Sequence, residues 1–92
     1  MPKTIRVEVA YADPQTQILR TVDIATGATV ADAISVSGVL NELPGFVPAG
    51  FGIFGRIVEA ATPLRGGDRI ELYRPLQLDP KTARRKRAER RA

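Results

Sequence analysis

The sequence predicts a small α+β domain in which one main helix covers one face of a mixed β-sheet. Runs of alternating apolar and polar residues indicate strands, and a single run with helical spacing separates the first two of them from the rest. The order β-β-α-β-β-β within about 75 residues is typical of a two-layer domain. A chain of 92 residues accommodates one such domain, which excludes a two-domain enzyme.

The first two runs predict a β-hairpin. Residues 4–11 alternate with period two, residues 16–24 do so again, and Asp13 and Pro14 between them favour a turn. The apolar positions are Ile5, Val7, Val9 and Tyr11 in the first run and Ile18, Val22 and Ile24 in the second.

A short helix is expected after Gly27. Thr29 is a suitable N-cap, and Asp32 stands at the third helical position, where its charge favours the positive end of the helix. Ser37-Gly38 predicts the end of this helix. The residues expected to face the core are Val30, Ala33 and Ile34, and Val39, Leu40 and Leu43 predict a further turn that ends at Pro44-Gly45.

Three short strands are expected in the second half of the chain. Residues 51–54 and 56–59, interrupted by Gly55, predict brief strands or a tight hairpin. The Gly66-Gly67-Asp68 segment predicts a turn. Residues 69–73 predict the last strand, with Ile70 and Leu72 on its buried face.

The composition excludes most catalytic chemistry. The chain has no Cys and no His, and therefore no thiolate nucleophile, no imidazole acid or base and no zinc or haem ligand from these residues. Ser35 and Ser37 lack an imidazole to activate them. We expect no enzymatic activity, no metal and no cofactor. Since no signal-peptide pattern or membrane-spanning run is present, we expect a soluble, cytoplasmic protein.

Two glycine motifs are better explained by local structure. Residues 50–55 match G-x-G-x-x-G, but a dinucleotide site needs a helix to begin there, whereas a strand-like run follows. Gly66-Gly67 lies inside the chain, so it is not the free Gly-Gly end that small acyl or sulfur carriers activate. Both motifs therefore predict tight turns or close backbone packing.

The positive charge is concentrated at the C-terminus. Residues 1–78 contain seven basic and eight acidic residues, for a net charge of −1, whereas residues 79–92 contain seven basic and two acidic residues, for +5. Asp79-Pro80 could begin a terminal helix, but like charges four residues apart oppose it, so we expect a helical or disordered tail. Such a tail is expected to bind a polyanion, which is nucleic acid, an acidic protein surface or a membrane headgroup layer. The alternative is that it serves solubility alone.

Several segments resemble the RnfH family of small bacterial proteins. They are Gly52-Ile-Phe-Gly-Arg56, Leu64, Gly67-Asp-Arg-Ile-Glu-Leu-Tyr-Arg-Pro-Leu76, Asp79-Pro-Lys81 and Arg84-Arg-Lys-Arg-Ala88. The likeness covers nearly the whole chain, although Pro48-Ala-Gly-Phe51 is less polar than the family pattern. The resemblance implies a ubiquitin-like β-grasp fold and no activity. The family's name reflects association with a membrane electron-transport gene cluster in some bacteria.

Together these observations predict a β-grasp domain over residues 1–78 and a basic tail over residues 79–92. We expect a non-catalytic interaction module or adaptor that binds a protein, with a possible link to a membrane electron-transport complex. The alternative is an RNA-binding or ribosome-associated accessory that acts through the tail. The candidate partner-binding residues are Tyr73, Arg74, Pro75 and Leu76 at the junction and Arg84, Arg85, Lys86, Arg87, Arg90 and Arg91 in the tail.

Overall fold

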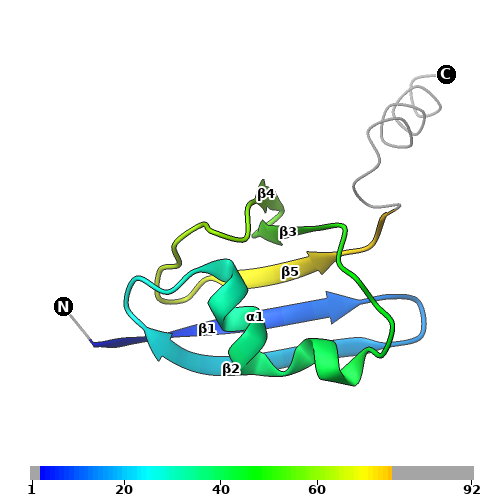
Figure 1. Ribbon diagram of the computed structural model, residues 1–92, viewed down its shortest axis with the longest axis horizontal. Coiled ribbons are helices and arrows are strands. Elements are labelled where there is room, and N and C mark those ends of the chain that lie inside the picture. The colour runs from blue at the N-terminus through cyan, green and yellow to red at the C-terminus, as the bar shows by residue number, and fades with distance from the viewer. Residues whose placement is uncertain (1–2, 76–92) are drawn as a thin grey trace, which may run out of the picture.

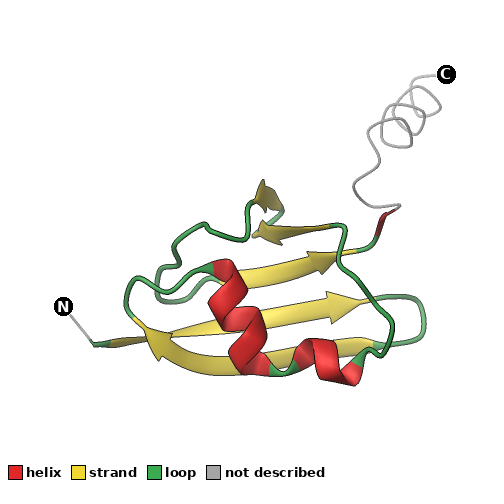
Figure 2. Cartoon of the chain, viewed as in Figure 1, coloured by secondary structure: helices red, strands yellow, loops and turns green. Residues whose placement is uncertain are grey.

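The computed structural model describes residues 3–75 and contains a five-stranded sheet with one α-helix against one face (Figure 1). Figure 2 shows the two helical segments on the same side of the sheet. In chain order the elements are β1 (Thr4–Ala12), β2 (Gln17–Ala25), α1 (Val30–Ser37), the 3-10 helix η1 (Val39–Glu42), β3 (Gly50–Ile53), β4 (Arg56–Val58) and β5 (Arg69–Tyr73). The predicted α+β class and the order of the elements are confirmed.

The spatial order of the strands is β2-β1-β5-β3-β4. The central strand β5 is parallel to its neighbour β1, and the other neighbouring pairs are antiparallel. A mixed sheet in which the first and last strands lie side by side, crossed by one helix, is the β-grasp arrangement that the family resemblance implies. Consequently the carboxyl ends of β1 and β5 meet at the same edge of the domain.

The predicted apolar faces form the core. Burial alternates along β1 and β5, so one side of the sheet packs against α1 and the other side faces solvent. Val9, Val30 and Ile70 have no exposed surface, and Leu64 contributes from the loop before β5. The buried set is Val7, Val9, Tyr11, Ile18, Ile24, Val30, Ala33, Ile34, Val39, Leu64, Ile70 and Leu72.

The ends of α1 follow the predicted signals. The Thr29 hydroxyl accepts a hydrogen bond from the Asp32 amide, and the Asp32 carboxylate accepts one from the Thr29 amide, which completes a capping box. Gly38 ends the helix in the left-handed conformation, with φ of 71°. The predicted further turn is η1, which begins directly after Gly38.

The glycines of the rejected nucleotide motif serve the β3–β4 hairpin. Gly55 has φ of +82° in the turn, a conformation that side chains disfavour. A Cβ atom on Gly52 would lie 2.1 Å from the Tyr73 hydroxyl oxygen, so β3 requires glycine where the Tyr73 ring crosses it. Gly67 has φ of +89° in the predicted turn before β5. Both glycine motifs therefore have the structural roles predicted for them.

In the part of the chain that the structure describes, no helix combines the length and the apolar character needed to cross a membrane. Leu76, the predicted boundary at residues 78–79 and the whole basic tail lie outside the described residues.

Candidate functional site

The first candidate surface is the junction at the carboxyl end of β5. Because β1 and β5 are parallel, Tyr73, Arg74 and Pro75 leave the sheet beside the end of β1 and its following turn. The charge of Arg74 acts on that turn: after the hydrogen bonds from Tyr11, Gln15 and Thr16 it contributes to the lowered pKa of Asp13, and it offsets part of the rise in the pKa of Tyr11. β5 therefore ends next to Asp13, whose carboxylate is held by hydrogen bonds within the turn.

Tyr73 is held on the solvent-facing side of the sheet by contacts within the domain. Its hydroxyl donates a hydrogen bond of 2.7 Å to Glu71, and the same carboxylate oxygen accepts a 3.0 Å bond from the Gly55 amide. Burial, followed by the hydrogen bond to Glu71 and the negative charge of that carboxylate, raises the pKa of Tyr73 to about 12. The side chain thus clamps the β3–β4 hairpin to β5 across Gly52.

Asp13 organises the turn beside the junction. Its carboxylate accepts a 2.6 Å hydrogen bond from the Tyr11 hydroxyl and two 2.7 Å bonds from the amides of Gln15 and Thr16. The hydrogen bond from Tyr11 is the main cause that lowers the pKa of Asp13, and the same bond is the main cause that raises the pKa of Tyr11. Tyr11 also makes an edge-to-face contact with Phe46, with ring centroids 5.0 Å apart.

The charged side chains on the open face of the sheet are engaged in pairs. Arg6 lies 2.9 Å from Asp23, and Arg69 lies 3.1 Å from Glu8. Arg69 reaches across to β1 because the parallel register places Glu8 opposite it, and its chain neighbour Asp68 accepts a hydrogen bond from the backbone amide of Arg65.

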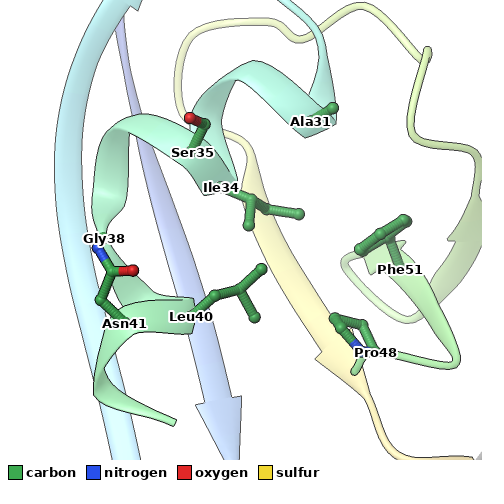
Figure 3. A pocket seen from close by; sticks show the side chains of 8 residues that line it. All are labelled: Ala31, Ile34, Ser35, Gly38, Leu40, Asn41, Pro48 and Phe51. Carbon is green, nitrogen blue, oxygen red and sulfur yellow. The ribbon is translucent and has the colours of Figure 1, made fainter. Parts of the chain in front are cut away.

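The second candidate surface is an apolar groove of about 420 Å³ between the helical segments and β3 (Figure 3). Figure 3 shows Ile34 and Leu40 pointing from the helical side toward Phe51 and Pro48 on the opposite side. No charged residue belongs to the lining, which consists of Ala31, Ile34, Ser35, Gly38, Leu40, Asn41, Pro48 and Phe51. Such a lining favours apolar groups and offers no acid or base.

The sequence analysis did not predict this groove, because its lining residues come from segments on both sides of the loop that connects η1 to β3. A signal was present in the sequence, since Leu40, Val47 and Val36 are apolar residues outside the predicted core pattern. In the structure they are 37%, 78% and 61% exposed. Pro48 and Phe51 lie in the stretch that is less polar than the family pattern, and both line the groove.

The structure brings together Tyr73, Arg74 and Pro75 of the predicted binding residues. Pro75 is exposed and Arg74 is partly buried. The remaining predicted residues lie outside the described part of the chain, and they are Leu76, Arg84, Arg85, Lys86, Arg87, Arg90 and Arg91. The Tyr73 hydroxyl is hydrogen-bonded within the domain, to Glu71.

Comparison with known proteins agrees with this geometry. The family described as RnfH family Ubiquitin matches residues 5–87. The chain belongs to the RnfH family. Similar family members carry the name Protein RnfH. One from Halorhodospira halophila is 48% identical over 94% of this chain and 91% of its own length. One from Laribacter hongkongensis is 51% identical over 92% of this chain and 81% of its own length.

Among solved structures, a ubiquitin-like protein of the archaeon Caldiarchaeum subterraneum aligns with a TM-score of 0.47 and 16% identity. The alignment covers 76% of this chain and 96% of the archaeal chain. The family match and the observed topology, rather than this neighbour, establish the ubiquitin-like fold.

Proposed function

We propose that this member of the RnfH family is a non-catalytic adaptor that binds a protein partner through the groove of Figure 3. The single observation that carries the proposal is this apolar, uncharged hollow in the surface of a small domain within a chain of only 92 residues. Apolar side chains of a partner gain free energy by leaving water for such a surface.

A protein is favoured as the occupant because the apolar surface continues beyond the groove. Val47 adjoins Pro48 in the chain and is mostly exposed. A small ligand would leave this side chain in water, whereas a protein surface could cover it together with Leu40. Exposed apolar residues around a hollow are typical of a protein contact.

The junction and the tail supply the electrostatic part of the proposed interface. Pro75 is exposed where β5 ends, Arg74 precedes it, and six of the seven cations of the tail follow in the sequence, namely Arg84, Arg85, Lys86, Arg87, Arg90 and Arg91. These cations favour an acidic region on the partner and speed its association. A component of a membrane electron-transport complex is one partner class that the family resemblance suggests.

RNA binding through the tail is the alternative function, favoured by the charge of +5 over residues 79–92. The described residues do not add to it, because Lys3 and six arginines face eight carboxylates there. Nucleic-acid affinity would therefore depend almost entirely on the tail and fall steeply with salt.

Pull-down from bacterial extract tests the two functions, with full-length protein and a variant lacking residues 81–92, with and without nuclease. Leu40→Asp places a charge in the groove, and Ile57→Asp is the matched control, because Ile57 is 71% exposed on the far side of the sheet. We expect a partner that survives nuclease and high salt, is lost with Leu40→Asp and is kept with Ile57→Asp. Capture that requires nucleic acid and the tail would contradict the adaptor function and support the alternative.

A further inference from the structure

The free edge of β2 is a second surface that can recognise a protein. Among the described strands β2 pairs with β1 alone, and Figure 1 shows β2 at the border of the sheet. An edge strand presents alternate backbone amides and carbonyls to solvent. Such a row is a template for one more strand.

The hydrogen-bond pattern identifies which backbone groups point outward. At the two ends of the pair, Asp13 donates to the Thr16 carbonyl and Thr26 donates to the Lys3 carbonyl, so the even-numbered residues of this segment face β1. The odd-numbered residues Thr21 and Asp23 therefore direct their amides and carbonyls to the free edge.

One end of this edge is covered. Arg20 Nη1 donates a 3.0 Å hydrogen bond to the carbonyl of Leu19, and the same guanidinium pairs with Glu42 of η1. Beyond this contact lie the outward amides and carbonyls of Thr21 and Asp23 and the amide of Ala25, whereas the Ala25 carbonyl accepts a hydrogen bond from the Ala28 amide. The accessible part of the edge is therefore the half of β2 that runs toward α1.

A groove of about 450 Å³ lies beside that half, between β2 and α1. Its apolar lining includes Ile24, Ala28 and Val36, and Val36 is 61% exposed. Asp32 also lines it, whereas the carboxylate of Asp23, another lining residue, pairs with Arg6 on the open face of the sheet. A strand added to β2 would place alternate side chains over this groove.

We propose that the edge of β2 from Thr21 to Ala25 binds an extended segment of a partner protein that carries apolar side chains and a basic residue. The apolar side chains enter the groove beside Val36, and the basic one lies near Asp32. This inference deepens the proposed function, since it names the kind of segment recognised, but it uses a different surface from the groove of Figure 3.

A second copy of the chain is a poorer occupant of the same edge. Antiparallel pairing of β2 with its own copy through the outward-facing residues would lay one groove with its Asp32 carboxylate toward the other, and the groove lining contains no cation. Like charges placed together across a strand pair are destabilising. A basic segment instead complements them.

Selection of random linear peptides displayed on phage against the full chain tests this proposal. We expect enrichment of alternating apolar sequences with a basic residue, whose binding slows hydrogen exchange at the amides of Thr21 and Asp23. Thr21→Pro removes an outward amide without breaking a bond to β1 and should weaken binding at least about tenfold. Thr21→Val keeps the amide and should bind as the natural chain does.

Peptides methylated at backbone nitrogens test the strand pairing independently, without any substitution in the protein. If the peptide adds as a strand, N-methylation should weaken binding at alternate positions only, and replacing its basic residue with glutamine should reduce the affinity. Peptides that bind but respond to Leu40→Asp and not to Thr21→Pro would overturn this proposal while leaving the proposed function intact. Failure to enrich any peptide, or a dimer that protects the Thr21 amide, would also overturn it.

Discussion

Replacing Gly52 with alanine tests the clamp formed by Tyr73. The added Cβ would lie 2.1 Å from the hydroxyl oxygen, 2.6 Å from Cζ and 2.7 Å from Cε2 of Tyr73. The backbone of Gly52 is held between Glu71 and Ile57 by pairing on both sides, so the ring must move. Its movement breaks the 2.7 Å hydrogen bond to Glu71.

The expected cost follows from the contacts that are lost. A hydrogen bond to a charged group contributes about 1.5–3 kcal/mol, and partial exposure places this one at the lower end. Exposing part of the ring adds roughly 0.5–1 kcal/mol at about 25 cal/mol per Å². Replacing glycine with alanine within a strand by itself raises the free energy of unfolding by about 0.5–1 kcal/mol. We therefore expect Gly52→Ala to lower the free energy of unfolding by about 1–2 kcal/mol.

Urea denaturation of a double-mutant cycle measures the effect. Tyr73→Leu removes every ring atom that the new methyl would meet, so Gly52→Ala in that background should be neutral or stabilising by up to ~1 kcal/mol. The two backgrounds should thus differ by about 2 kcal/mol. An equal cost of Gly52→Ala with and without the Tyr73 ring would refute the clamp.

Three further predictions concern the core, the helix cap and the response to pH. Ile70 has no exposed surface, so Ile70→Val should cost about 0.5–1.5 kcal/mol and Ile70→Ala about 2–5 kcal/mol in urea denaturation, and a smaller loss for alanine than for valine would contradict its central position. Thr29→Ala removes the capping hydroxyl of α1 and should lower the free energy of unfolding by about 1 kcal/mol, measured in the same way, with the exposed Thr21→Ala as a control. Because the pKa of Tyr73 is raised to about 12, its contribution is fully present below the ordinary pKa near 10 and is lost as the pH rises toward 12. Tyr73→Phe should remove this part of the alkaline loss of stability, and an unchanged pH profile would argue against the raised pKa.

The secondary structure was predictable because its signals are local. Alternation defined β1, β2 and β5, and Thr29, Asp32 and Gly38 marked the ends of α1 through hydrogen bonds that span only a few residues. Strand boundaries differed by about one residue, as is usual where pairing rather than composition ends a strand. The resemblance added the strand order, which periodicity alone does not specify.

The binding surfaces were less predictable. Tyr73 was predicted to bind a partner, and the structure shows its hydroxyl bonded to Glu71 and its ring against Gly52 of β3, which is distant in sequence. Arg69 pairs with Glu8 rather than with its sequence neighbours, because β1 and β5 are parallel.

By itself the sequence determined the elements of this protein, its aliphatic core and the separation of a near-neutral domain from a cationic tail, since each depends on residues close together in the chain. Only the tertiary structure decided that α1, η1 and the segment before β3 enclose an uncharged groove and that β2 keeps a free edge. Both features arise from the packing and pairing of distant segments, and neither leaves a continuous pattern in the sequence.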